Sequence, residues 1–194
     1  MKKYVFLAMI LLFASCSTND EMEQTIFVPD AINSELPAYT EWGYNSFGAM
    51  YERRYFLATN DIVPCKITYQ NRIMTFSLSG RVGSSNTTLN FSFPVNETLR
   101  NYKDLLVLHQ KEIDLTNSAC EVRMTTNSST KPLTVLSGKL FFQRVQLLRI
   151  NEKEDRVILS GTFNLSFLQN NSQPEALTKG RFDVGIANLF ILPN

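Results

Sequence analysis

The sequence predicts a mainly antiparallel all-β fold, either a β-sandwich or a partly closed β-barrel of about eight to ten strands with one short helix. Apolar and polar side chains alternate along most of the chain after residue 46, which is the period of a strand with one buried face. Polar connections separate these stretches, and a single segment has helical spacing. The composition agrees, because 49 Ser, Thr and Asn residues supply polar strand faces in a chain with only 19% charged residues.

The first alternating stretches begin near residue 47. Apolar residues that share one parity there, and that we expect on one face of the sheet, are Phe47, Ala49, Tyr51, Tyr55 and Leu57. Further alternating apolar residues are Met74, Phe76, Leu78, Leu89, Phe91 and Phe93. A tight hairpin is expected at Gln70-Asn71, since Asn tolerates a positive φ, and a second turn is expected at Gly83-Ser84-Ser85.

One segment breaks the strand pattern and predicts a helix over about residues 98–110, covering one end of the sheet or barrel. Its cap pair is Asn101 with Asp104 three residues later. The residues at helical spacing are Leu99, Tyr102, Leu105, Leu106 and His109. Because His109, the only histidine, lies on this apolar stripe, we expect it to be structural rather than catalytic.

The clearest alternation lies late in the chain, where apolar residues occupy one face: Val157, Leu159, Gly161, Phe163, Leu165 and Phe167. The opposite face, expected to meet water, carries Ser160, Thr162, Asn164 and Ser166. Polar loops at 151–155 and 170–174 separate this strand from strand segments at 140–150 and 181–191. Three consecutive strands with short polar connections predict an antiparallel meander.

Residues 1–15 are expected to be a signal peptide. Lys2 and Lys3 precede an apolar run of ten residues, Tyr4 to Phe13, which is too short for a membrane span of about 20 residues. Removal of the peptide leaves 17 basic and 18 acidic residues, a net charge of −1. We therefore divide the chain into the signal peptide, a lipid anchor and tether at 16–38, and a single β-rich domain at 39–194.

The end of the signal peptide, Phe13-Ala14-Ser15-Cys16, resembles the bacterial lipobox, although Phe13 stands where Leu is usual. The resemblance implies a lipoprotein in which Cys16 carries acyl chains such as palmitate and tethers the body to the cell outer membrane. Asp20-Glu21-Met22-Glu23 looks like the acidic surface-export signal of Bacteroidetes lipoproteins. The alternative is a solvated tether, so the exterior and the periplasmic face both stay open.

The charge balance and the cysteines narrow the classes of partner. With 19 basic and 18 acidic residues, the chain lacks the basic excess of a nucleic-acid binder, and we expect none. Cys65 and Cys120 can form a disulfide on the exported side of a membrane, or can be buried separately as small hydrophobic residues. One histidine and two distant cysteines cannot complete a tetrahedral metal shell, so no metal site and no cofactor are expected.

Aromatic residues are concentrated between residues 39 and 56, which hold seven of the 22 in the chain. Phe47, Tyr51 and Tyr55 are expected in the core because they alternate. Tyr39, Trp42 and Tyr44 precede the strand and obey no alternation, so they are the surface-binding candidates, suited to stacking on sugars or peptides. Arg53 and Arg54 are expected to supply guanidinium donors beside these rings.

The chain lacks the common catalytic motifs, including the nucleophile elbow, the zinc-protease helix and the phosphate-binding glycine loop. Two carboxylate pairs, Glu112/Asp114 and Glu152/Asp155, have a spacing that can flank a glycosidic bond. Both pairs lie in charged turn or loop segments where solvation is the default. Enzymatic activity is therefore the less favoured hypothesis.

The chain resembles an uncharacterised family of Bacteroidetes outer-membrane and surface lipoproteins, a domain of unknown function, in three segments. Two of them, Leu159-Ser160-Gly161-Thr162-Phe163 and Thr178-Lys179-Gly180-Arg181-Phe182-Asp183-Val184, match its C-terminal pattern of a Ser-Gly-Thr-Phe strand and a Thr-x-Gly-Arg-Phe-Asp partner. The third, Trp42-Gly43-Tyr44-Asn45-Ser46-Phe47-Gly48-Ala49, is similar to its N-terminal pattern. The resemblance implies a β-rich surface lipoprotein and supplies no catalytic residues.

These observations favour a non-enzymatic, lipid-anchored outer-membrane protein that binds a glycan, a peptide or an envelope protein, or acts as an accessory module. A second hypothesis is a barrel that carries a small apolar ligand, which requires a void lined by Phe76, Phe91, Phe163 and Phe167. A third is a glycan-directed hydrolase, which requires paired carboxylates in one cleft.

Overall fold

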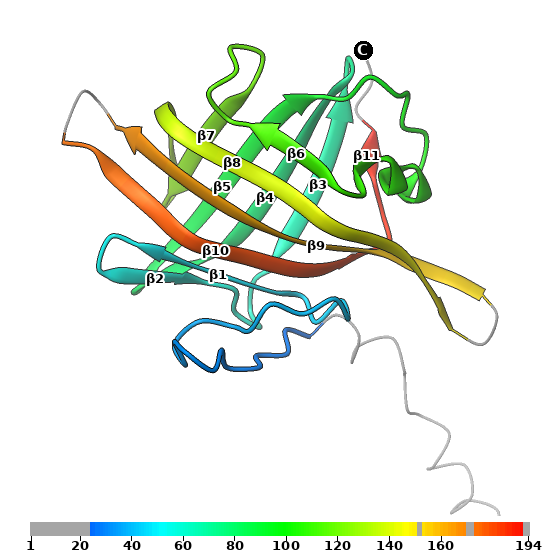
Figure 1. Cartoon of the computed structure of the whole chain (residues 1–194), viewed down its shortest axis with the longest axis horizontal. Helices are drawn as coiled ribbons and strands as arrows, with labels where there is room; N and C mark the ends of the chain where they lie inside the picture. Colours follow the sequence, from blue (N-terminus) through cyan, green and yellow to red (C-terminus); the bar gives the residue numbers. More distant parts are fainter. Residues whose placement is uncertain (1–23, 151–152, 170–172, 192–194) are drawn as a thin grey trace, which may run out of the picture.

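The computed structural model describes residues 24–150, 153–169 and 173–191 and shows an antiparallel β-barrel of eight strands with one short helix (Figure 1). This confirms the predicted fold class. The elements are β1 (Ser46–Tyr51), β2 (Arg54–Leu57), β3 (Cys65–Gln70), β4 (Ile73–Val82), β5 (Ser85–Pro94), η2 (Tyr102–Leu108), β6 (Lys111–Asp114), β7 (Glu121–Thr126), β8 (Ser129–Ile150), β9 (Lys153–Leu168), β10 (Glu175–Ile186) and β11 (Phe190–Ile191).

The barrel closes through the pairing of β4 with β5. Around the ring the strand order is β4-β2-β1-β10-β9-β8-β7-β5, and the long hairpin from Ile73↔Pro94 to Val82↔Ser85 joins its two ends. β3 pairs with β4, β11 pairs with β3, and β6 pairs with β8, so these three strands extend the sheet beside the ring. A closed ring leaves no unpaired edge, which distinguishes this fold from a sandwich.

Two-residue turns set the register of the hairpins. The turn between β3 and β4 lies at Asn71-Arg72, one residue later than predicted, and both residues have a positive φ, as Asn71 was expected to tolerate. Gly83, with φ of 60°, begins the turn between β4 and β5 at the predicted place. These turns make consecutive strands neighbours.

The predicted inward positions of Tyr55 and Leu57 are wrong. A two-residue turn between β1 and β2 brings Ala49 opposite Phe56, and residues directly opposite in an antiparallel pair share a face. Phe56 is therefore 1% exposed in the core, while Tyr55 and Leu57 are only partly buried. The alternation of β1 does not continue across a turn that reverses the chain.

The C-terminal meander of β8, β9 and β10 is confirmed by continuous antiparallel pairing. The predicted apolar face of β9 points into the barrel, with Phe163 at 1% and Phe167 at 0% exposure. The other face differs from the prediction at Ser160, which was expected to meet water and is 0% exposed. The N-terminal segment covers this part of the outer surface, as described below.

Phenylalanine rings fill the barrel. Phe76 contacts Phe91, Phe142 and Phe182 with ring centroids 5.0–6.4 Å apart, and Phe91 contacts Phe163 at 5.5 Å. The four rings on which the carrier hypothesis depends, Phe76, Phe91, Phe163 and Phe167, are at most 1% exposed. Neither of the two cavities described below is lined by them.

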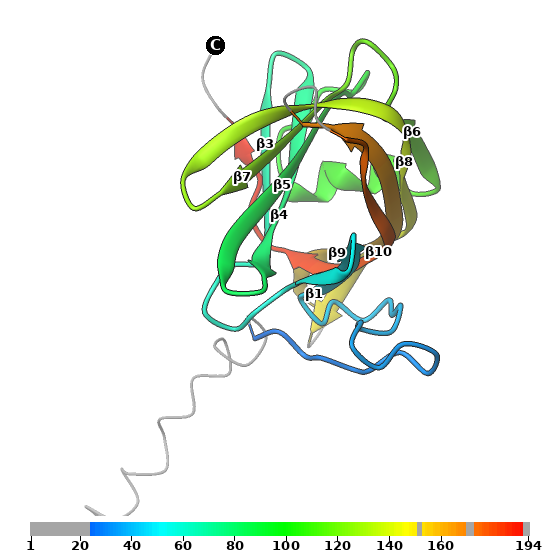
Figure 2. The same ribbon diagram turned by 90° about the vertical axis from the view of Figure 1, so that its left-hand side faces the viewer.

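The helix η2 lies at one end of the barrel, and Figure 2 looks toward the opposite end with η2 at the back. Its predicted capping pair is present, since Asn101 accepts the Lys103 N–H and Asp104 accepts the Asn101 N–H. The helix is a 3₁₀-helix, so residues three apart share a face, and the buried pair is Leu105 and Leu108. Leu106, expected on the buried stripe, is 40% exposed.

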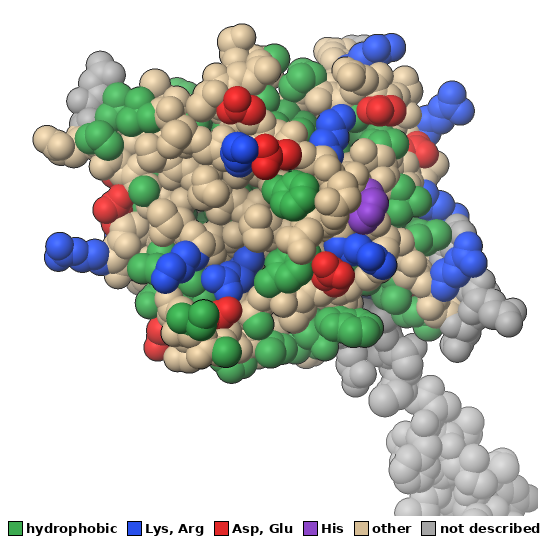
Figure 3. All heavy atoms as spheres, viewed as in Figure 1, with side chains coloured by type: hydrophobic (Ala, Val, Ile, Leu, Met, Phe, Trp, Pro, Cys, Tyr) green, Lys and Arg blue, Asp and Glu red, His purple; other side chains and the backbone are tan. Residues whose placement is uncertain are grey.

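Residues 24–45 form the N-terminal segment, which runs along the outside of the barrel below β1 and β10 (Figure 1). The Ala38 N–H donates to the Val28 carbonyl, the Ile26 N–H donates to the Tyr44 carbonyl, and Leu36 is 0% exposed. Residues 24–38, assigned to the tether by sequence, therefore contact the domain. Hydrophobic side chains gather along the lower edge of the molecule, where this segment lies (Figure 3).

Gly161 allows β9 to approach its neighbours closely. A Cβ there lies 2.0 Å from the Phe141 carbonyl oxygen and 2.7 Å from the Phe182 ring. We expect Gly161→Ala to lower the free energy of unfolding by about 2 kcal/mol or more, because the clash involves backbone. Chemical denaturation measures the loss.

The control for this substitution is Gly83→Asn. Gly83 has open space around it and a φ that Asn adopts, so little change in stability is expected. Equal stability of the Gly161→Ala and wild-type proteins contradicts the packing described for β9.

Candidate functional site

The carboxylate of Asp183 on β10 attaches the N-terminal segment to the barrel. Its Oδ2 accepts the Thr40 hydroxyl at 2.5 Å and the N–H groups of Trp42 at 3.1 Å and Tyr44 at 3.3 Å. Its Oδ1 accepts the Gly43 N–H at 2.8 Å and the Ser160 hydroxyl at 2.9 Å. With five donors around a side chain that is 1% exposed, the buried charge is fully compensated.

The conformation of the loop depends on two residues that follow Trp42. Gly43 has φ of +75°, which turns three successive N–H groups toward one carboxylate. Asn45 has a positive φ as well, and its Oδ1 accepts the Gly185 N–H from β10 at 3.0 Å. The sequence segments that carry the family resemblance thus meet here, since Trp42–Ala49 and Thr178–Val184 are joined through Asp183.

A second connection lies further along the segment, at Asp30. Its carboxylate accepts the N–H groups of Asn33 and Ile32, and Arg181 of β10 pairs with it at 2.6 Å. The backbone N–H groups, followed by the guanidinium, lower the pKa of Asp30 below its ordinary value. The segment is therefore held at two points along β10.

The edge of this segment and strand β8 enclose a surface groove of about 460 Å³, the aromatic groove. Its lining residues are Tyr39, Thr40, Glu41, Trp42, Arg144 and Gln146. Arg144 and Gln146 lie on β8 opposite Ser160 and Ile158, whose own neighbours on β10 are Asp183 and Gly185. The groove thus begins where the N-terminal segment stops covering the barrel.

Hydrogen bonds fix the polar side of the aromatic groove. The Tyr39 hydroxyl donates to Glu41 Oε1 at 2.9 Å, and the Gln146 amide donates to the Glu41 carbonyl oxygen at 2.7 Å. Arg144 Nε donates to Gln146 Oε1 at 3.1 Å, which leaves its terminal Nη groups for a ligand. Burial, and then the bond to Glu41, raise the pKa of Tyr39 above its ordinary value, so the phenol remains a hydrogen-bond donor.

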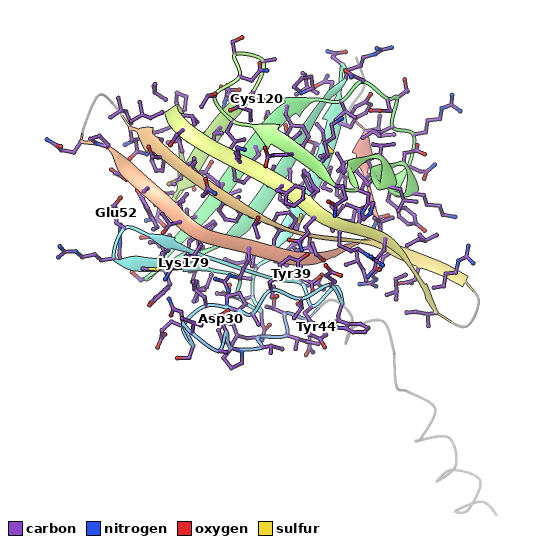
Figure 4. The ribbon with its side chains drawn as sticks, in the orientation of Figure 1. Asp30, Tyr39, Tyr44, Glu52, Cys120 and Lys179 are labelled. Atoms are coloured by element: carbon purple, nitrogen blue, oxygen red, sulfur yellow. The ribbon has the colours of Figure 1, made fainter. Side chains whose placement is uncertain are left out.

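The three surface-binding candidates occupy different places. Trp42, the only tryptophan, is 71% exposed in the groove wall, and Tyr39 is partly buried beside it. Tyr44 lies on the same segment, as Figure 4 shows together with Tyr39, but is absent from the groove lining. The structure therefore brings two of the three together, and Arg144 rather than Arg53 or Arg54 supplies the guanidinium.

Cys65 and Cys120 are free thiols, so the disulfide that the sequence left open is absent. Cys65 lies on β3 and Cys120 precedes β7, with strands β4 and β5 between them. This separation exceeds the 7 Å between Cα atoms that a disulfide tolerates, because adjacent strands are about 4.8 Å apart. Burial raises the pKa of both thiols, and the Asp114 charge adds to the effect at Cys120.

The remaining candidates for chemistry have structural partners. His109 Nδ1 accepts the Val145 N–H at 3.1 Å, which attaches the end of η2 to β8. Glu112 pairs with Lys139 at 2.7 Å, and Asp114 accepts the Thr116 N–H and hydroxyl. Neither carboxylate lines the aromatic groove.

In the second carboxylate pair, Asp155 is bonded to Arg156 at 2.6 Å. Its partner Glu152 lies outside the described residues. Cys16 and the rest of the expected signal peptide and export signal also lie outside them.

Residues 24–150, 153–169 and 173–191 contain no group of three His, Cys, Asp or Glu side chains placed to hold a metal ion. No helix in the same part of the chain is long and apolar enough to cross a membrane.

Comparison with known proteins adds no relative: the chain matches no protein-family model, no curated protein and no solved structure. The site therefore has to be interpreted from its own geometry.

Sequence reasoning missed five residues of this region: Thr40, Glu41, Asp183, Arg144 and Gln146. Asp183 lies in a segment that carries the family resemblance, and an acidic residue inside a strand of apolar neighbours was a signal that it accepts buried donors. Arg144 and Gln146 are about 100 positions from Trp42, and their place in the groove follows only from the pairing of β8 with β9. No pattern in the sequence joins them to Tyr39 or Trp42.

We expect Asp183→Asn to lower the free energy of unfolding by about 3 kcal/mol, because an amide NH₂ group replaces one acceptor among five donors. Chemical denaturation followed by circular dichroism measures it. The matched control is Asp61→Asn, since Asp61 pairs with Arg81 on the exposed surface and its substitution is expected to change the stability little. Similar losses for the two variants contradict the role given to Asp183.

Proposed function

We propose that this protein is a non-enzymatic, lipid-anchored binding protein of the cell outer membrane that holds a glycan in the aromatic groove. The single observation that carries the proposal is Trp42, a large ring 71% exposed on a loop whose backbone is fixed by three N–H bonds to Asp183. Exposing a large aromatic ring to water is unfavourable, so covering the ring with a ligand contributes favourable binding free energy. Because the backbone is already rigid, little conformational entropy is lost on binding.

The chemistry of the groove suits a sugar. Sugar rings present C–H groups on one face and hydroxyls around the rim, so they stack on an aromatic ring and hydrogen-bond beside it. Trp42 and Tyr39 supply the aromatic rings, and the Arg144 guanidinium supplies hydrogen-bond donors. Glu41 supplies carboxylate acceptors, and Gln146 supplies an amide. A groove of about 460 Å³ is within the range of small-molecule sites.

The anchor and the location rest on the sequence. The lipobox-like Phe13-Ala14-Ser15-Cys16 supports acylation at Cys16, and the resemblance to the Bacteroidetes lipoprotein family supports a place at the outer membrane. Seven residues separate Cys16 from Gln24, the first described residue, so an anchor at Cys16 holds the barrel close to the lipid surface. In this proposal the groove lies among envelope glycans.

Binding is tested by screening the body from residue 24 onward on a glycan array and titrating the best-binding glycan. Trp42 is the only tryptophan, so its fluorescence reports occupancy of the groove directly. We expect Trp42→Ala to weaken binding about 30-fold, as for a central aromatic contact, with little change in stability.

Phe27→Ala is the control for this variant. Phe27 is 46% exposed on the same N-terminal segment and does not line the groove, so its loss is expected to leave affinity unchanged. An array without any binding glycan, or equal affinity of the Trp42→Ala and wild-type proteins, contradicts glycan binding in this groove.

The anchor is tested by metabolic labelling with a fatty acid. We expect the full-length protein to be labelled and to sediment with membranes, and Cys16→Ala to lose both properties, because Cys16 is the acylated residue. Cys65→Ala is the matched control and is expected to stay labelled. A Cys16→Ala protein that is still acylated contradicts the anchor.

A further inference from the structure

The end of the barrel opposite η2, which faces the viewer in Figure 2, is called the barrel mouth here. The interior changes there from apolar to polar and basic side chains. A cavity of about 350 Å³ lies there, and its polar lining includes Arg54, Ser85, Thr87, Thr126, Ser129 and Lys131. Elsewhere the inward-facing positions hold mainly Phe and Leu side chains, whereas at the mouth they hold hydroxyl groups and two cations.

Both cations lie on the interior faces of their strands, Lys131 partly buried and Arg54 exposed at the rim beside the β1–β2 turn. Arg54 pairs with Tyr51, which is 8% exposed, and Lys131 pairs with Met124, which is 3% exposed. Residues directly opposite in an antiparallel pair share a face, so each cation lies on the interior face of its strand. A lysine at such a position is unusual, because interior positions of small barrels are normally filled by apolar side chains.

The two cations lie on opposite walls of the mouth. Arg54 belongs to β2 and Lys131 to β8, and these strands are four places apart in a closed ring of eight. Strands at that separation face each other across the interior. An anion in the mouth therefore has a positive charge on either side.

The third charged group that faces this end is Glu175 of β10, and it already has a partner. The Tyr51 hydroxyl donates to Glu175, and the Arg54 guanidinium lies 5.5 Å from the centre of the Tyr51 ring. Burial, and then this bond, raise the pKa of Tyr51, so the phenol keeps its proton. A second carboxylate, Glu52 in the turn before β2, also acts on Tyr51, and it accepts the Ala176 N–H. Both carboxylates near the mouth therefore have hydrogen-bond partners, and the charged residues that line the cavity are Arg54 and Lys131.

We propose that the barrel mouth is a second binding site, separate from the aromatic groove, for a small polyhydroxylated carboxylate such as a sugar acid. The carboxylate lies between Arg54 and Lys131, and its hydroxyls bond with the ring of Ser and Thr side chains. Thr87, 3% exposed, and Thr126 face each other across paired strands and stand at the base of this ring.

The test is isothermal titration of the full-length protein in detergent with D-glucuronate, and with D-glucose as the neutral probe. We expect D-glucuronate to bind and added salt to weaken its binding. Any binding of D-glucose is expected to be weaker and to be lost in Trp42→Ala, because it belongs to the aromatic groove. Lys131→Met and Arg54→Met are each expected to reduce the affinity for D-glucuronate at least about tenfold, since each removes a charge-assisted bond.

Lys139→Met is the matched control, because Lys139 lies on the same strand β8 but is exposed and pairs with Glu112. It is expected to keep wild-type affinity, as is Trp42→Ala, which alters only the aromatic groove. Melting temperatures confirm folding, and Lys131→Gln replaces Lys131→Met where the latter does not fold.

Three results overturn the proposal: no binding of D-glucuronate at millimolar concentration, equal binding of D-glucose, or unchanged affinity of the Lys131 variants. Loss of D-glucuronate binding in Trp42→Ala but not in the Lys131 variants also overturns it, because the probe then occupies the aromatic groove. The two sites are therefore tested independently.

Discussion

The carboxylate of Asp183 lies between the barrel and the N-terminal segment with 1% of its surface exposed, and a charge in that position is stable only when donors surround it. Four of its five donors come from Thr40, Trp42, Gly43 and Tyr44, and the fifth is Ser160 on β9. If the segment left the barrel, the Asp183 carboxylate and its donors would all lose their hydrogen-bond partners at once. The burial of Ser160 and the shape of the aromatic groove both follow from this contact.

The two ends of the barrel differ in their side chains, and aromatic rings fill its centre. Phenylalanine rings occupy the middle, η2 closes one end through Leu105 and Leu108, and the other end carries Arg54 and Lys131. The two proposed binding sites therefore lie at the mouth and on the outer wall. Strands carry Arg54 and Lys131 at the mouth and Arg144 and Gln146 in the groove, whereas Tyr39 and Trp42 lie on the loop that Asp183 holds.

Patterns within one element were predictable, and contacts between distant elements were not. The alternation around Phe76 and Phe163 and the Asn101–Asp104 cap depend on neighbours within a few residues, so the sequence alone indicated them. The pairings of β1 with β10 and of β5 with β7 that complete the ring, the burial of Ser160, and the meeting of Trp42 with Arg144 depend on topology. The turn at residues 52–53 likewise reversed the expected face of Tyr55, because one turn changes the parity of all that follows.

Amide hydrogen exchange, followed residue by residue by NMR on the uniformly labelled protein, tests the attachment of the N-terminal segment most directly. The N–H groups of Trp42, Gly43 and Tyr44 lie outside any strand and are bonded only to Asp183. The structure predicts that they exchange as slowly as amides of β9 and β10, since their opening requires release of the buried carboxylate. Exchange at the rate of a free peptide contradicts the account.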